Sequence, residues 1–155
     1  MTVFMRVEKV SSHNRIIIGS ENLTRLNQFA IIEPSMTMRG GGMIFRESET
    51  IELKEVVVDE IKKEIIAFAN CDGGKLYIGV QDDGTVVGVD DPDGVSLQIS
   101  NMVRDAIKPD VTMFLHYKTI EEDGKEIVAV DIQRGTDRPY YLVKKGMRPQ
   151  GVYVR

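Results

Sequence analysis

The stretch from Ile65 to Val80 restricts the fold of this chain more than any other part of the sequence. Apolar residues recur every three or four positions in its first part, which is the spacing of one buried face of a helix. Asn70 then closes the helix, and Gly73-Gly74 supplies the positive φ angles that residues with side chains resist. From Lys75 to Val80 the residues alternate in polarity, as they do in a strand. A helix that passes this abruptly into a strand predicts helices packed directly on a sheet.

The rest of the sequence predicts about six strands and two helices, which is an α+β fold with both helices on a mostly antiparallel sheet. The first helix is expected from Val57 to Ala69. The second follows the capping residues Asp90–Asp93 and ends before Pro109, with Leu97 among its inward side chains. Strands are expected at residues 50–55, 75–80, 85–89, 111–120, 126–133, 140–143 and 152–154, and those at 75–80 and 85–89 are expected to form a hairpin around Asp82-Asp83-Gly84.

Length and composition are those of an ordinary globular domain. The chain has 155 residues, of which 42% are hydrophobic and 28% are charged. No apolar run approaches the roughly 18 residues of a membrane span, and no secretory signal begins the chain, so we expect a cytoplasmic protein without a membrane partner. Cys71 is the only cysteine, which excludes an internal disulfide and a cysteine-based zinc site within one chain.

The residue pattern suggests two domain boundaries, one near residue 42 and one beyond residue 155. Residues 1–42 hold short strand-like stretches near Val3–Val7 and Arg15–Ile18, followed by a linker-like run at residues 33–42. A second interpretation is that Met43 is the natural start and that residues 1–42 lie upstream of it. The other end, Gly151–Arg155, is still strand-like, so we expect residues 43–155 to be one domain of a longer parent chain, with further domains after it.

A basic segment lies near the end of the chain. Although the net charge is −4, six bases and a single acid, Asp137, fall between Arg134 and Arg155. Local charge decides phosphate binding, and tyrosines can stack on unpaired bases. The alternative is a solvated tail, with each tyrosine packed in the core. The candidate nucleic-acid-binding residues are Lys75, Arg134, Arg138, Tyr140, Lys144, Lys145, Arg148 and Arg155.

An acidic group forms the second candidate site. Glu47, Glu52 and Asp82 lie at or near strand ends, and Lys54 lies two residues beyond Glu52 on the same strand face. Converging carboxylates bind Mg²⁺ or Mn²⁺, and such an ion activates water against a phosphodiester. Glu47 and Glu52 can meet only if the chain bends near Ser48. The alternative is an ordinary solvated strand face, with the turn acids exposed.

Several motifs, in order and at matching spacing, make the chain from Met43 to Arg155 resemble the Schlafen-type AlbA-like domain. The resemblance implies a nucleic-acid-binding domain that often begins longer proteins described as transcriptional regulators or divergent ATPases. It also implies candidate catalytic acids, because animal Schlafen relatives cleave transfer and ribosomal RNA with three carboxylates at positions that match Glu47, Glu52 and Asp82. The matching residues are Glu47–Glu55, Ala67–Asn70 with Gly73-Gly74, Leu76–Val80, Asp82–Gly84 with Val87-Gly88, Ile107–Pro109, Pro139-Tyr140 and Tyr153–Arg155.

Three functions therefore stand as predictions. The first is a DNA- or RNA-binding domain of a transcriptional regulator, which needs no cofactor to bind. The second is an endoribonuclease dependent on Mg²⁺ or Mn²⁺, with Glu47, Glu52, Asp82 and Lys54 as its catalytic residues. The third is a scaffold or homodimer formed through edge strands. Any ATP site is expected in the missing C-terminal part of the parent chain, because no P-loop motif occurs here.

Overall fold

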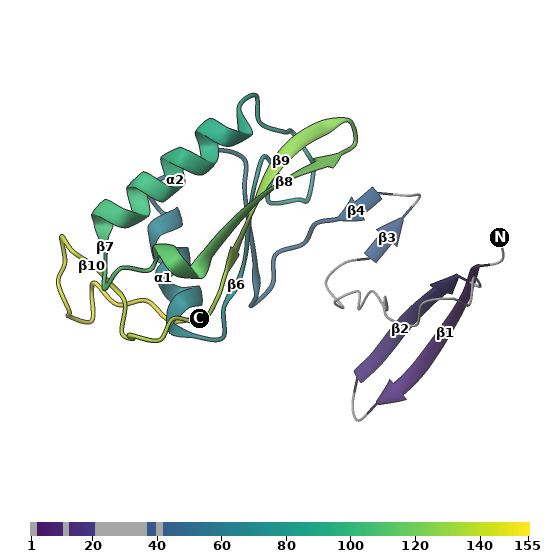
Figure 1. Ribbon diagram of the computed structural model, residues 1–155, viewed down its shortest axis with the longest axis horizontal. Helices are drawn as coiled ribbons and strands as arrows, with labels where there is room; N and C mark the ends of the chain where they lie inside the picture. Colours follow the sequence, from purple (N-terminus) through teal and green to yellow (C-terminus); the bar gives the residue numbers. More distant parts are fainter. Residues whose placement is uncertain (1–2, 11–12, 21–36, 40–41) are drawn as a thin grey trace.

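The structure, a computed structural model, describes residues 3–10, 13–20, 37–39 and 42–155 (Figure 1). Its elements in chain order are β1 (Val3–Val10), β2 (His13–Ser20), β3 (Thr37–Arg39), β4 (Gly42–Ile44), β5 (Ile51–Lys54), α1 (Ile61–Asn70), β6 (Gly74–Ile78), α2 (Pro92–Ala106), β7 (Ile107–Lys108), a 3₁₀ turn (Thr112–Phe114), β8 (Leu115–Glu122), β9 (Lys125–Ile132) and β10 (Tyr141–Leu142). The predicted α+β class with two helices and a mostly antiparallel sheet is confirmed.

The central sheet has four strands in the order β5-β6-β9-β8. The β5 and β6 strands are parallel, with α1 as the connection between them, and the other two neighbouring pairs are antiparallel. Three two-stranded pairs, β1-β2, β3-β4 and β7-β10, accompany this sheet. In Figure 1, α1 and α2 lie together on one side of the sheet. The helices therefore cover one face of the sheet only, and residues outside the helices pack on the other face.

The α1 helix forms because its apolar residues fall on one side, and it begins at Ile61 rather than at Val57. It ends at Asn70, as predicted. Gly73 adopts a φ of +86°, so the predicted need for glycine is met there. Gly74 instead begins β6, and a Cβ at this position would lie 2.2 Å from the Phe68 ring. The second glycine is therefore required for close packing of the strand beneath the helix and not for its φ angle.

The α2 helix begins where its capping residue predicts. The Asp91 side chain accepts a hydrogen bond of 2.9 Å from the Gly94 backbone N–H, and Pro92 is the first helical residue. Its inward residues include the buried Ile99 and Val103. The prediction for Leu97 is wrong, because 61% of its surface is exposed.

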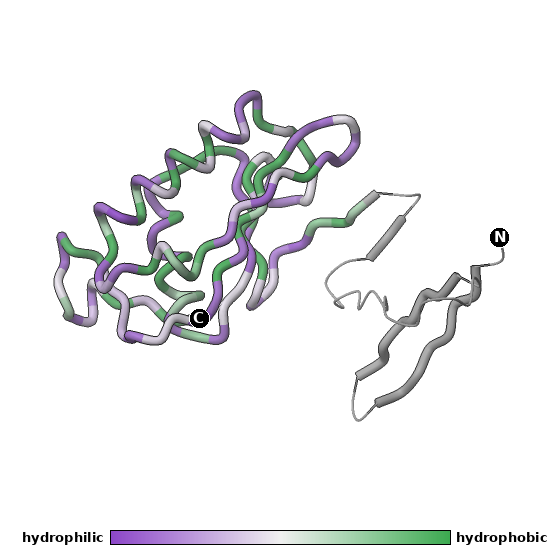
Figure 2. The backbone as a smooth tube through the Cα atoms, viewed as in Figure 1, coloured by the Kyte–Doolittle hydropathy of each residue, from purple (hydrophilic) through white to green (hydrophobic). Residues whose placement is uncertain are grey.

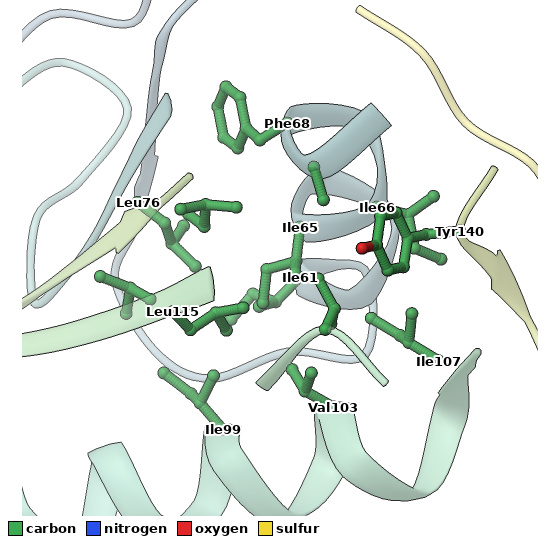
Figure 3. Close-up of a cluster of buried hydrophobic side chains, with 14 of the residues drawn as sticks. Ile61, Ile65, Ile66, Phe68, Leu76, Ile99, Val103, Ile107, Leu115 and Tyr140 are labelled. Carbon is green, nitrogen blue, oxygen red and sulfur yellow. The ribbon is translucent and has the colours of Figure 1, made fainter. Parts of the chain in front are cut away.

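Residues on the two faces of the sheet belong to two separate hydrophobic clusters. Leu76 and Ile78 of β6 pack with α1 and α2 on the helix face, whereas Tyr77 points to the other face, which confirms the predicted alternation. Figure 3 shows the helix-face cluster, in which side chains from both helices meet those of the sheet. Along α2, apolar and polar stretches alternate in Figure 2, as expected of a helix that covers a core with one side only.

Four predicted segments differ in the structure. Residues 85–89 form no strand, and only Val86 bridges to Val80. Residues 152–154 likewise contribute a single bridge, from Val152 to Tyr141. The predicted strand at 111–120 begins later, at Leu115, because a 3₁₀ turn precedes it. Within the predicted linker at residues 33–42, Thr37–Arg39 pairs with Gly42–Ile44, and its remaining residues lie outside the described part of the chain.

The Asn70 side chain joins the end of α1 to the C-terminal segment. Its Nδ2 donates hydrogen bonds to the carbonyl oxygens of Tyr140 at 3.0 Å and Tyr153 at 2.9 Å. Its Oδ1 accepts a hydrogen bond of 2.8 Å from the Tyr140 N–H. One amide thus holds two segments that are far from it in sequence, and we call these three bonds the Asn70 clamp.

We expect Asn70→Ala to lower the free energy of unfolding by about 2–4 kcal/mol, because it removes three hydrogen bonds and leaves backbone groups without partners. Urea denaturation followed by circular dichroism measures the effect as a lower midpoint with an unchanged slope. Gln98→Ala, at an exposed position of α2, serves as the control and is expected to change little. Equal midpoints for the two variants would contradict a structural role for the clamp.

Candidate functional site

Glu52 is the buried charge of the domain, with only 8% of its surface exposed. It lies on β5 beside Leu76 of β6, on the face that the helices cover. The Lys54 ammonium donates to one of its carboxylate oxygens, and the Arg155 guanidinium donates to the other at 2.8 Å. The alternative of a solvated strand face is therefore wrong for Glu52, because this carboxylate is half of a compensated ionic site.

Arg155 holds several groups together at this site. Its guanidinium donates to Glu64 at 2.6 Å and to the Ser48 carbonyl at 3.0 Å, and it lies 4.7 Å from the centre of the Phe68 ring. Its backbone N–H donates to the Cys71 sulfur at 3.3 Å. A guanidinium suits this position because it forks between two carboxylates while stacking on an aromatic face.

Glu47 reaches the site through the predicted bend of the chain. Ser48 and Ile51 form an antiparallel bridge with two backbone hydrogen bonds, so the chain reverses direction between Glu47 and β5. The Glu47 carboxylate then accepts a hydrogen bond of 3.4 Å from the Leu53 N–H. The chain therefore makes the bend near Ser48 that a meeting of Glu47 and Glu52 requires, and Glu47 lies beside the strand that carries Glu52.

Asp82 approaches from the turn that follows β6. The backbone N–H groups of Gly79 and Val80 both donate to the Lys54 carbonyl, which fixes this turn at the end of β5. Asp82 itself is exposed. Of the three predicted acids, Glu52 contacts the Lys54 ammonium directly, and the negative charges of Glu47 and Asp82 help to raise the pKa of Lys54.

The pKa values at the site follow from this arrangement. Burial opposes the charge on Lys54, yet its hydrogen bond to Glu52 and the charges of Glu52, Glu47 and Asp82 outweigh burial and raise its pKa. Burial also disfavours the Glu52 carboxylate, but the bonds from Lys54 and Arg155 lower its pKa below 4.5. Glu64 shows the opposite balance, because burial and then the negative charge of Glu52 raise its pKa above 4.5.

The acids as arranged do not fit a divalent cation. Both oxygens of Glu52 already face a cationic side chain. Throughout residues 42–155 and the other described segments, no three His, Cys, Asp or Glu side chains are placed to hold a metal ion together. Lys54 and Arg155 supply the positive charge that such an ion would otherwise bring.

The predicted basic residues divide into two groups. Arg134 pairs with Asp72, Arg155 lies in the acidic site, and Arg138 bonds to the Asn70 carbonyl. Tyr140 is fully buried, so the alternative of core packing holds for this residue. The exposed bases on the loop after β10 are Lys144, Lys145 and Arg148, and Lys75 lies partly buried on β6.

Two residues of the site were not predicted from the sequence. Glu64 was not among the candidate residues, and Asn70 was predicted to end the helix but not to bond to the C-terminal segment. Glu64 and Phe68 are four residues apart and therefore share one side of the helix, where Arg155 contacts both. The sequence carried this spacing, but it gave no sign that Arg155 would reach it.

Comparison with known proteins agrees with the α+β fold of this domain. The Schlafen, AlbA_2 family profile matches residues 47–155. The chain belongs to this family, as the motifs predicted. No curated protein matches the sequence significantly.

Two of the solved structures that resemble the domain illustrate its likeness to known folds. One is the N-terminal domain of a RecG-related protein from Nitrosomonas europaea, which is 27% identical over 70% of this chain and 79% of that one, with a TM-score of 0.56. The other is the DIP2311 protein from Corynebacterium diphtheriae, at 15% identity and a TM-score of 0.50. The match covers 69% of this chain but 22% of the Corynebacterium chain, and it supports the fold alone.

Glu52→Gln and Glu64→Gln should change stability in opposite ways with pH. Because folding lowers the pKa of Glu52, its carboxylate stabilises the fold above pH 4.5, and this contribution is lost as pH falls through the lower folded value. We expect Glu52→Gln to lower the free energy of unfolding by about 1.5–3 kcal/mol at pH 7 and by progressively less in acid.

Because folding raises the pKa of Glu64, wild-type protein gains stability from protonating this group as pH falls towards 4.5. Glu64→Gln is therefore expected to be at least as stable as wild type at pH 7, with this advantage shrinking in acid. Urea midpoints between pH 3 and pH 8 measure both effects, with Glu49→Gln at an exposed turn position as the matched control. A Glu52→Gln loss that stays constant with pH would contradict the assignment of Glu52 as a charged partner.

Proposed function

We propose that the domain binds nucleic acid through the loop that follows β10. The observation that carries this proposal is that Lys144, Lys145 and Arg148 are all exposed on this one loop. Lys108 on β7 is exposed beside it, because β7 pairs with β10. Such a cluster concentrates positive charge on a chain whose total charge is −4. We call Lys108, Lys144, Lys145 and Arg148 the basic end.

The basic end extends towards the start of α1. The pKa of Asp59 is lowered first by a hydrogen bond from Lys62 and then by the charges of Lys62, Lys144 and Lys63. Lysines from the C-terminal loop and from α1 therefore act on the same carboxylate. A surface that gathers bases from separate segments can meet several phosphates of one backbone.

A solved structure that resembles this domain supports a role in a longer protein that acts on nucleic acid. The N-terminal domain from Nitrosomonas europaea comes from a protein described as related to a DNA helicase. We propose that the present domain likewise serves as the nucleic-acid-binding part of a longer regulator or helicase-like chain. In this arrangement the domain supplies affinity for DNA or RNA, and the other domains supply the remaining activity.

We expect Lys144→Glu to weaken binding at least fivefold and Lys144→Glu with Lys145→Glu to abolish it, since each reversal adds repulsion to lost attraction. Fluorescence anisotropy with labelled DNA and RNA at 50–200 mM salt measures this, and wild-type affinity should fall steeply as salt rises. Lys125→Glu, an equal charge change at the tip of the β8–β9 hairpin, is the matched control. Unchanged affinity in the double variant would overturn the basic end as the binding surface.

A second candidate function is RNA cleavage, which is favoured by the effect of Glu47, Glu52 and Asp82 on the same Lys54 ammonium. The ion pairs at Glu52 weigh against a metal-dependent reaction, because a metal ion would have to displace the side chain of Lys54 or Arg155 from this carboxylate. Incubation of transfer RNA with the protein and Mn²⁺, followed by gel electrophoresis, tests the claim. We expect any genuine cleavage to disappear in Asp82→Asn, an exposed substitution that should leave the fold intact.

Cleavage that persists equally in Asp82→Asn and Glu52→Gln would come from a contaminant and would remove the enzymatic function. Absence of cleavage in wild-type protein would do the same. The predicted homodimer stays a prediction, and light scattering of the protein at several concentrations would test it.

A further inference from the structure

The face of the sheet opposite the helices is only partly covered. Phe45, Val80 and Val86 pack over one part of it, around Tyr77. Beside them a groove of about 680 Å³ crosses β6, β9 and β8. This volume lies within the range of sites that hold a small organic group. We call it the open-face groove, and its lining includes Lys75, Tyr77, His116, Lys118, Ala129 and Asp131.

Strand register places basic side chains in two neighbouring rows across this groove. In one row Lys75, Asp131 and His116 lie side by side on β6, β9 and β8. In the next row Tyr77, Ala129 and Lys118 are neighbours in the same order. Three basic side chains, those of Lys75, Lys118 and His116, therefore border the groove together with one acidic side chain, that of Asp131. The small Ala129 side chain leaves room at the centre of the second row.

The groove continues past Lys75 and Asp131 into a second hollow of about 370 Å³ at the end of the sheet. Lys75 and Asp131 line both, and Arg134 lines the second. The acid Asp72 at this end is paired with Arg134 at 2.9 Å. At the other end Glu122 accepts a hydrogen bond from the Met43 N–H, which engages that carboxylate as well. Lys75 therefore lies where the two hollows meet, and Lys118 lies beyond it in the larger one.

We propose that the open-face groove binds the unpaired nucleotides of a single-stranded nucleic acid. Lys75 and Lys118 would contact phosphates of the strand, and a nucleobase would lie over Ala129 beside the His116 ring. An apolar floor with basic edges matches a planar ring that carries a phosphate on each side. A duplex hides its bases, so it can use the basic end but not this floor. The inference deepens the proposed function, and it depends on that function being correct.

The first test is a titration of the full chain with hexathymidylate or hexauridylate, followed by amide chemical shifts. We expect the largest shifts at the backbone amides of residues 116–118 and 129–131, and we expect a hairpin duplex of equal charge to leave them in place. Large shifts confined to residues 143–150 would overturn the proposal. Equal shifts in the groove with the duplex would also overturn it.

The second test compares binding variants by anisotropy with the same single strands. We expect Lys118→Glu to weaken binding at least fivefold and to reduce the slope of log affinity against log salt by about 0.7, the value for one phosphate of a single strand. Lys125→Glu, on the same hairpin but outside the lining residues, is the control. Ala129→Leu should fill the floor and lower affinity for single strands while sparing the duplex.

The outcomes separate this proposal from the proposed function. If Lys118→Glu and Ala129→Leu bind like wild type while the Lys144→Glu, Lys145→Glu pair loses binding, the groove is overturned and the nucleic-acid function stands. If wild-type protein binds no strand at all, the function itself fails. Urea midpoints check that Ala129→Leu is folded, and Lys118→Glu carries the test alone if it is not.

Discussion

The hydrogen bonds of Asn70 set the position of the C-terminal segment, and the acidic site depends on that position. A single amide at the end of α1 bonds to backbone groups of both Tyr140 and Tyr153. Arg155 follows directly and reaches Glu52 and Glu64. Each bond is worth about 1 kcal/mol on its own, but together they decide where a guanidinium lies relative to two carboxylates. The site is therefore built from segments that do not adjoin in sequence.

Charge balance around β5 is the second organising feature. Burying a carboxylate is unfavourable unless a cation and further hydrogen bonds accompany it. Glu52 has Lys54 from its own strand and Arg155 from the other end of the chain, so its burial is tolerated. Glu64 also bonds to Arg155, but its burial and the nearby negative charge of Glu52 outweigh that bond and raise its pKa. The contacts of these acids thus describe a compensated ionic network.

The sequence allowed much of the fold to be predicted, because local patterns determined it. The alternation of β6, the cap at Asp91 and the turn at Gly73 depend on residues close in sequence. Leu97 was misassigned because helical periodicity alone does not say how wide the buried stripe is. Residues 85–89 looked like a strand, but their backbone groups bond to Gly79 and Glu126 without forming a ladder.

The candidate site was harder to predict than the fold. Residue types singled out the three acids as candidates, and Glu47 could meet Glu52 only if the chain bent near Ser48. The pairing of Arg155 with Glu52 could not be predicted, because Arg155 was grouped with its basic neighbours in sequence. Its partners lie on β5 and α1, and only the path of the C-terminal segment across α1 brings them together. Likewise, strand register alone aligns Lys75, Asp131 and His116 on one face.

The contact between Glu52 and Arg155 spans 103 positions of the chain. Contacts of such long range carry a large loop-closure entropy, so they form after the local elements of a domain have assembled. During synthesis, Glu52, Lys54 and α1 leave the ribosome well before Arg155. A nascent chain that has completed the sheet therefore still carries a carboxylate with only one of its two cations, and docking of the segment that holds Arg155 supplies the second.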